Sequence, residues 1–234
     1  MPYFGIDPLY LVLVMPAVLL SLWASIKVKS TFAQYSRVRT RRGISGAETA
    51  KAILLANGIH DVRVEEVKGF MTDHYDPRQR VLRLSPDVYR GQSVSSVGVA
   101  AHEVGHALQH GDGYAPLALR SFCVPVASIG SNLAWPLLVI GALLQMTALA
   151  YAGLVLFGSV VLFQLVTLPV EFNASSRAIA QISHLGLVSR EEEDGARRVL
   201  FAAAMTYVAA AVVALLNLLY WLMRLGLLGG RRSG

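Results

Sequence analysis

The chain has a single cysteine, Cys123, and few charged residues. One cysteine excludes an internal disulfide and leaves the redox compartment open. Charged types make up 15% of the 234 residues, against about 25% in an ordinary soluble domain, whereas apolar types make up 54%. This composition excludes a disordered chain, a disulfide scaffold and a collagen-like repeat. It indicates that much of the chain lies in lipid.

Charge is missing from three long segments, which predict membrane spans. Residues 8–26 are uncharged, and at about 1.5 Å per residue a helix of this length matches the hydrocarbon core of a bilayer. Residues 121–170 are also uncharged. They are far too long for one crossing and predict a hairpin of two helices with its turn at residues 145–147. Residues 200–223 predict a fourth span, although this helix could instead re-enter the membrane.

The basic residues are placed asymmetrically, which predicts the orientation of the spans. The formal net charge is +6, and most of the 21 Lys and Arg residues lie in residues 27–120 and 171–199. By the positive-inside rule these two segments are cytoplasmic and the N-terminus is outside. Arg224, Arg231 and Arg232 weakly oppose an outside C-terminus. We expect an integral membrane protein that contacts the lipid bilayer and no nucleic acid, because no basic stripe interleaved with aromatic residues is present.

Two helices are predicted in the charged segment that follows the first span. Ser45 and Glu48 form a capping box that begins a helix, and Asn57 with Gly58 ends it. Ser93 can cap a longer helix that continues to about residue 110.

Two short strands are predicted between these helices. Residues 61–67 alternate as a half-buried strand does, and residues 80–84 form the second strand. Residues 75–77, which end in proline, predict a turn before the second strand. Residues 80–84 just precede the second helix, so we expect an edge strand that holds an extended peptide by β-augmentation. The alternative is an ordinary inner strand of a small sheet.

His102, Glu103 and His106 form an H-E-x-x-H sequence on the predicted longer helix. Residues four apart share one helix face, so both imidazoles can bind one metal ion at about 2 Å. Glu103 lies beside that face, where it can act as a general base toward a water that the metal polarises. The alternative is a helix with surface His and Glu residues, but such groups on an otherwise apolar helix are costly unless they are satisfied. The pattern predicts one Zn²⁺ per chain, although the residues alone do not exclude cobalt or manganese.

A catalytic zinc site needs a third protein ligand and one open position. The extended metzincin motif is excluded, because Gln109 and Asp112 stand where it has Gly and His. His110 lies about 12 Å along the helix from His102, too far to share the ion. Glu171 is the first charged residue after the uncharged segment, and the hairpin would return it beside the helix. We expect Glu171 to be the third ligand; the alternative is a helix-end carboxylate that faces water.

Several segments of the chain match the motifs of one family. They are H-E-V-G-H-A-L-Q-H at residues 102–110, V-E-F-N-A-S-S-R at residues 170–177, and residues 72–78, 81–85 and 113–116. With these motifs and its span pattern the chain resembles, over nearly its whole length, the YugP-like membrane zinc metallopeptidases, and more distantly HtpX and the type 1 CAAX prenyl proteases. The resemblance implies a gluzincin-like peptidase. In the HtpX-like relatives the third zinc ligand is the Glu of an E-F-x-A-D segment, and this role carries over to Glu171.

The chain departs from the family pattern at one position. The Asp of the E-F-x-A-D segment falls on Ser175, so a carboxylate that would orient a ligand histidine is missing or is supplied elsewhere. Asn173, Ser175 and Asp73 are the alternatives for this role.

An amide hydrolase also needs a hydrogen-bond donor for the developing oxyanion. His74, Tyr75 and Arg177 are the candidates. His74 fits a polar residue of a turn equally well, and Arg177 fits a partner for a carboxylate or a lipid phosphate better than an oxyanion donor.

The fold class that we expect is a mainly α membrane protein with four transmembrane helices and a small α+β cytoplasmic domain that carries the H-E-x-x-H helix. The expected division is an N-terminal anchor (1–27), a cytoplasmic zinc-peptidase domain (28–120), a transmembrane hairpin (121–170), a cytoplasmic segment with the third ligand (171–199), and a C-terminal transmembrane helix with its tail (200–234).

The expected function is that of a zinc metalloendopeptidase in a bacterial plasma membrane. It would hydrolyse membrane-associated polypeptides at the cytoplasmic face, as in quality control of membrane proteins. A protease with its site inside the bilayer is disfavoured, because Asp87, Arg90 and Asp112 flank the motif closely. A catalytically degenerate zinc-binding scaffold or regulator is the other alternative: the missing family Asp favours it and the intact Glu103 opposes it. The residues do not indicate an oligomeric state.

Overall fold

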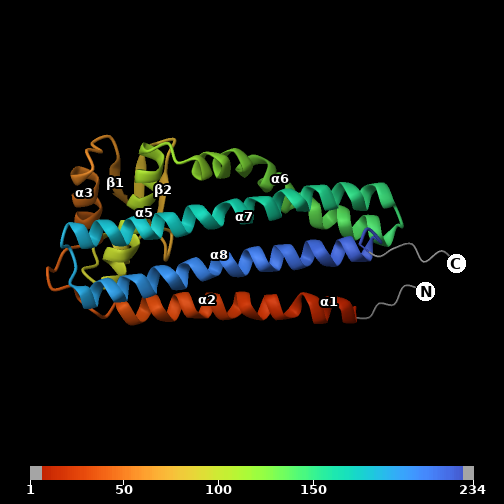
Figure 1. Cartoon of the computed structure of the whole chain (residues 1–234), viewed down its shortest axis with the longest axis horizontal. Helices are drawn as coiled ribbons and strands as arrows, with labels where there is room; N and C mark the ends of the chain where they lie inside the picture. The colour runs from red at the N-terminus through yellow and green to blue at the C-terminus, as the bar shows by residue number, and fades with distance from the viewer. Residues whose placement is uncertain (1–6, 229–234) are drawn as a thin grey trace. The chain divides into compact units, whose positions relative to one another are not determined.

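The computed structural model describes residues 7–228, which are mainly helical with one small sheet (Figure 1). The chain forms two compact units. The first comprises Met1–Ala24, Leu119–Leu168 and Thr206–Gly234, and the second comprises Ser25–Ala118 and Pro169–Met205. The predicted outside position of the extreme N-terminus, and the tail residues Arg231 and Arg232, lie outside the described residues.

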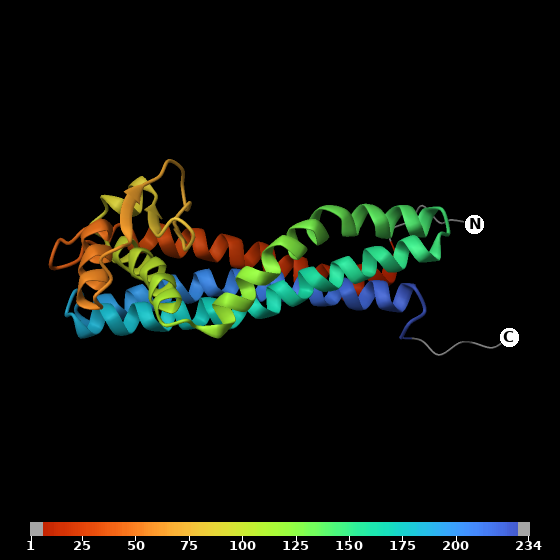
Figure 2. The same ribbon diagram turned by 90° about the horizontal axis from the view of Figure 1, so that it is seen from above.

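Three long helices supply most of the first unit, and each is long and apolar enough to cross a membrane. They are α6 (Ala115–Leu143), α7 (Thr147–His184) and α8 (Arg190–Arg224). The turn between α6 and α7, seen from above in Figure 2, lies where the sequence predicts it, and Gln145 adopts a φ of 55° there. The two helices approach closely at Gly141, where a Cβ would lie 2.5 Å from the backbone nitrogen of Ala150. Only a residue without a side chain permits this approach.

The first apolar segment forms two helices instead of the single helix predicted over residues 8–26. They are α1 (Pro8–Leu13) and α2 (Met15–Tyr35), which meet at Val14. The second of them continues through Lys27 and Lys29. Among the described helices, α6, α7 and α8 alone meet the length and composition of a span, since α1 takes the first apolar residues and α2 contains both lysines.

The sheet belongs to the second unit and has the strand order β1-β3-β2. Its strands are β1 (Arg63–Glu66), β2 (His74–Asp76) and β3 (Val81–Leu84). The first is parallel to β3 and the second is antiparallel to it.

The order and the bounds of the strands correct two of the sequence predictions. The strand predicted at residues 80–84 is β3, which is paired on both sides, so the prediction of an edge strand is wrong and the inner-strand alternative is confirmed. Its Val81, Leu82 and Leu84 are fully buried, as expected of a strand that is covered on both faces. The turn predicted at residues 75–77 is also misplaced, because the second strand continues to Asp76 and the turn follows it.

Helices complete the second unit around an apolar core. They are α3 (Gly46–Ala56), α4 (Pro86–Tyr89), α5 (Val94–Gly111), the end of α2, and the adjoining parts of α7 and α8. The capping box of Ser45 and Glu48 is present, and the Ser93 side chain accepts a hydrogen bond from the backbone of Ser96 at the start of α5. Helix α5 crosses the core, where Val97 is among its fully buried residues. The H-E-x-x-H sequence is therefore held on a rigid element.

Candidate metal centre

Helix α5 presents His102, Glu103 and His106 from its middle turns. The two rings lie on one face, with centroids 4.8 Å apart and planes at 84°. His106 and Glu103 are each 8% exposed. His102 is only partly buried, and most other residues of α5 are buried, so the polar groups on this face need partners.

Glu171 approaches the two imidazoles from α7. Its Oε2 lies 3.3 Å from Nε2 of His102 and 3.7 Å from Nε2 of His106, and its side chain is 2% exposed. The three donor atoms lie within 4.8 Å of one another and could hold a metal ion. Two ligands that are each about 2 Å from a tetrahedral ion are separated by roughly 3.3 Å. The cluster therefore has the spacing and the nitrogen and oxygen donors that zinc prefers.

The close approach of α5 and α7 brings the carboxylate to the imidazoles. Gly105, inside the H-E-x-x-H sequence, lies against the backbone of Ala174, three residues after Glu171. Pro169 lies inside α7, and the part of this helix that belongs to the second unit begins there. Glu171 therefore shares a compact unit with both histidines.

The outer nitrogen of each imidazole contacts a polar side chain. Nδ1 of His102 lies 3.1 Å from Oγ of Ser175, and Nδ1 of His106 lies 3.0 Å from Oε1 of Gln109. With each Nδ1 occupied in this way, each Nε2 faces Glu171. These contacts orient both rings toward one point.

Among the three alternatives for the Asp of the E-F-x-A-D segment, Ser175 is the one placed against a histidine of the cluster, His102. Asp73 instead accepts hydrogen bonds from the backbone nitrogen and hydroxyl of Ser85, at 2.7 and 3.0 Å. Asn173 contacts Gln109. A hydroxyl at Ser175 can donate or accept, so it fixes the protonated nitrogen of His102 less strictly than a carboxylate would.

The electrostatics of the cluster suit a cation. Burial raises the pKa of the Glu103 carboxyl, and the neighbouring rings of His102 and His106 oppose this shift in part. Burial alone would lower the pKa of His106, but the carboxylates of Glu171 and Glu103 outweigh it, so the pKa of His106 is raised. Two carboxylates therefore lie beside two imidazoles in a largely buried site, and a divalent cation would balance their charge.

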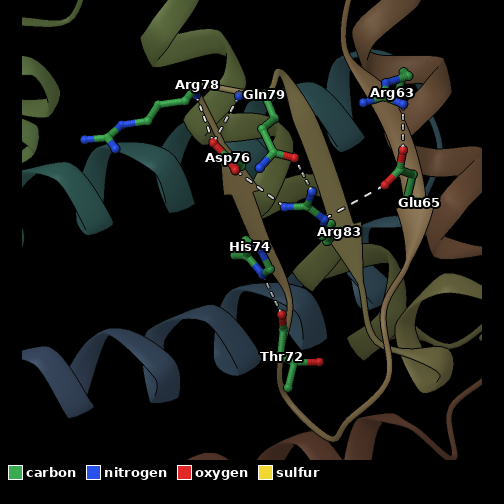
Figure 3. A network of polar contacts seen from close by, with 8 residues as sticks. All are labelled: Arg63, Glu65, Thr72, His74, Asp76, Arg78, Gln79 and Arg83. Atoms are coloured by element: carbon green, nitrogen blue, oxygen red, sulfur yellow. Dashed lines mark hydrogen bonds and ion pairs between the residues drawn. The ribbon is translucent and has the colours of Figure 1, made fainter.

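The three oxyanion candidates lie in different surroundings. His74 lies on the sheet face that carries Arg83 and Asp76, with its Nδ1 2.8 Å from the carbonyl oxygen of Thr72 (Figure 3). Tyr75 occupies the opposite face of the same strand, where its hydroxyl lies 2.9 Å from Nδ1 of His110 on α5.

The guanidinium of the third oxyanion candidate, Arg177, already contacts two polar side chains, those of Asp112 and Asn173. It forms an ion pair with Asp112 and donates through Nε to Asn173 at 2.8 Å. The ion pair with Asp112 is the carboxylate partnership that the sequence favoured for Arg177.

Sequence reasoning missed two residues of this site. Gln109 served only to exclude the metzincin motif, although its position three residues after His106 places it on the same helix face. Gly105 carried no prediction of its own. The signal for it was its place between His102 and His106, where a missing side chain permits the close approach of a neighbouring helix.

Comparison with known proteins covers almost the whole chain. A sequence profile of the family described as "Putative neutral zinc metallopeptidase" matches residues 10–226. The chain is 52% identical over 215 residues to the protein named "Putative membrane protease YugP" from Bacillus subtilis (strain 168). This match covers 92% of the chain and 96% of that protein. No solved structure matches the chain at a significant level.

Proposed function

The chain belongs to the family described as "Putative neutral zinc metallopeptidase", and we propose that it is a membrane-embedded zinc endopeptidase. The observation that carries this proposal is the convergence of His102, His106 and Glu171 on one point. Their three donor atoms would hold one zinc ion and leave a fourth position open. When bound, zinc would supply Lewis-acid polarisation and lower the pKa of the water that it holds.

Glu103 would perform the proton transfers of the hydrolysis. Glu103 is adjacent to His102 on α5 and is buried. Because it lies beside the helix face that carries the two histidines, it would reach the attacking water without binding the ion itself. Its carboxylate would take a proton from that water and deliver it to the leaving amine. The raised pKa that burial gives to Glu103 supports the role, since a general base works best with a pKa closer to the working pH.

The free edge of β2 is the place where we expect the polypeptide substrate. Within the described sheet β2 is an outer strand, and its Tyr75 reaches α5 through His110. An extended peptide added to this edge would run alongside the helix that carries the ligands. This proposal replaces the prediction that β3 binds the substrate.

The membrane topology that we propose has four spans with the second unit in the cytoplasm. The first span would combine α1 with the start of α2, and α6, α7 and α8 would supply the others. The support is the basic segment that begins at Lys27 and the absence of charge from the turn at residues 144–146. Substrates would then be membrane proteins or peptides at the cytoplasmic face of a bacterial plasma membrane, as in quality control.

A degenerate zinc-binding scaffold is the competing function, and the Ser175 substitution is the observation that favours it. Two features weigh against it. Glu103 is intact, and the Ser175 hydroxyl contacts His102 where the family carboxylate would stand.

Hydrolysis by the purified full-length chain tests the proposal. Glu103→Gln should abolish cleavage of casein and of a peptide panel while zinc content stays near that of the wild type. Glu65→Gln is the matched control, because Glu65 is a partly exposed carboxylate on β1, where it pairs with Arg63. A wild-type chain that binds zinc but cleaves nothing would favour the scaffold, and a Glu103→Gln variant that still cleaves would refute the role of Glu103.

A further inference from the structure

Gln109 is a fully buried amide at the contact between α5 and α7. Its Oε1 lies 3.0 Å from Nδ1 of His106. Its Nε2 donates to the backbone carbonyl of Val170 at 2.8 Å and to Oδ1 of Asn173 at 3.0 Å. We infer that Gln109 is a positioning residue, which fixes the ring of His106 and couples it to Glu171. The inference rests on the proposed zinc site.

The orientation of the Gln109 amide is dictated by its neighbours. The carbonyl of Val170 can only accept a hydrogen bond, and the guanidinium of Arg177 can only donate. Arg177 donates through Nε to Oδ1 of Asn173 at 2.8 Å, so the oxygen of Asn173 must face both Arg177 and Gln109. Gln109 therefore directs its NH₂ group at two acceptors, and its oxygen is left for His106.

This orientation fixes the tautomer of His106. An amide oxygen is only an acceptor, so Nδ1 of His106 must carry the proton in the contact with Gln109. Nε2 of the neutral ring then presents its lone pair toward Glu171. A metal ion needs this lone pair, and a ring in the other tautomer would have to exchange its proton before it could bind.

The same amide also ties the second helix to the site. Val170 directly precedes Glu171, so the hydrogen bond to its carbonyl holds the backbone of α7 one residue from the carboxylate. Asn173 lies two residues after Glu171, and its side chain accepts a hydrogen bond from the same Gln109 amide. Gln109 therefore contacts α7 both before and after Glu171. One side chain of α5 thus fixes a ligand on its own helix and the segment that bears a ligand on the next.

An ion pair holds the outer end of this network. Arg177 pairs with Asp112 at the C-terminal end of α5, and the same guanidinium engages Asn173. The hydrogen bonds run without a break from Asp112 through Arg177, Asn173 and Gln109 to His106. The network links the two helices twice, once at their exposed side and once at the metal centre.

Zinc affinity is the measurement that separates positioning from simple packing. Gln109→Met keeps the length and most of the volume of the side chain but removes all three hydrogen bonds. In the full-length chain, competition with a chelating dye should show zinc binding weakened by about 10- to 100-fold, the usual effect of losing an outer partner of a ligand histidine. Gln181→Met is the matched control, because Gln181 also joins two helices, through Asn57, but outside the cluster. It should leave zinc affinity unchanged.

A second readout follows the tautomer of His106. Nitrogen NMR of the metal-free chain with labelled histidine, at a pH where the rings are neutral, should find the proton on Nδ1 in the wild type. In Gln109→Met the ring should lose this preference. If Gln109→Met does not fold, Asn173→Ala takes its place, because it removes one of the two acceptors that orient the amide and should weaken zinc binding in the same direction.

Each outcome bears on a separate claim. Equal zinc affinity in the wild type and Gln109→Met, with the same tautomer, would overturn the role of Gln109 and leave the zinc site standing. A wild-type chain that takes up no zinc would instead overturn the proposed function itself.

Discussion

Gly105 lies so close to Ala174 that a Cβ on Gly105 would stand 2.5 Å from the carbonyl oxygen of Ala174. Real Cβ atoms do not approach a backbone oxygen so closely, so any side chain here would push α5 and α7 apart. The three donor atoms are shared between these two helices, and the separation of the helices sets the distances between His106 and Glu171.

Gly105→Ala should therefore loosen the metal centre. Overpacking of this kind typically lowers the free energy of unfolding by about 1–3 kcal/mol, and the displaced helix should also weaken zinc binding. Gly111→Ala is the control on the same helix, because the nearest atom to its Cβ would be 3.9 Å away. Melting curves and zinc titrations of both variants check this. Zinc affinity that is unchanged in Gly105→Ala would show that the contact does not position the ligands.

The three proposed ligands should each be needed for the stabilisation that zinc gives. Zinc should raise the melting temperature of the wild type, since a ligand at about 100 times its Kd stabilises by about 2.7 kcal/mol. His102→Ala, His106→Ala and Glu171→Gln should lose this increase, and chelation of the metal should reverse it in the wild type. His110→Ala is the control, because His110 lies on α5 but contacts Tyr75. A zinc-dependent shift that survives in Glu171→Gln would remove Glu171 from the ligand set.

Ser175 offers a test of the family position that this chain has changed. Ser175→Ala removes the contact with His102 and should weaken zinc binding by roughly 10-fold. Ser175→Asp restores the carboxylate of the relatives and should bind zinc at least as tightly as the wild type, because it fixes the proton on Nδ1 of His102. Ser176→Ala, an exposed serine on the next position of α7, is the control. Equal affinity in all four chains would exclude a role for position 175.

The free energy of unfolding should depend on pH in part through the carboxyl group of Asp73. Burial raises the pKa of this carboxyl, although hydrogen bonds from Ser85 oppose the shift in part. Because the folded state binds the proton more tightly than the unfolded state, this contribution is present at low pH and is lost as the pH rises from about 4 upward. The stability of Asp73→Asn relative to the wild type should therefore increase over the same range. Thermal melts across pH check this, and a difference that does not vary with pH would contradict it.

Cysteine labelling tests the proposed topology. In a Cys123→Ala background, Leu144→Cys places a thiol in the exposed turn between α6 and α7, and Glu65→Cys places one on the sheet of the second unit. A membrane-impermeant maleimide added to intact cells should label the first and leave the second unlabelled until the membrane is opened. Labelling of Glu65→Cys in intact cells would place the second unit outside.

The sequence predicted the elements whose signals are local. The capping box of Ser45 and Glu48 and the cap at Ser93 each mark a helix start within one residue. The prediction for Glu171 assumed that the uncharged hairpin returns to the membrane face from which it leaves, and in the structure Oε2 of Glu171 lies 3.3 Å from Nε2 of His102.

Other features depended on contacts between distant segments. Strand β2 was missed because it has three residues and ends before Pro77, where local chemistry favours a turn. The central place of β3 depends on pairing with that strand. The hydrogen bonds of Gln109 connect residues 61 and 64 positions apart along the chain, and no local pattern reports such a contact.

Anomalous diffraction from crystals of the zinc-loaded, full-length chain tests the central claim most directly. We predict one zinc peak per chain, about 2 Å from Nε2 of His102, Nε2 of His106 and a carboxylate oxygen of Glu171. A peak bound by other residues, or no peak between α5 and α7 in a chain that has been loaded with zinc, would contradict the account.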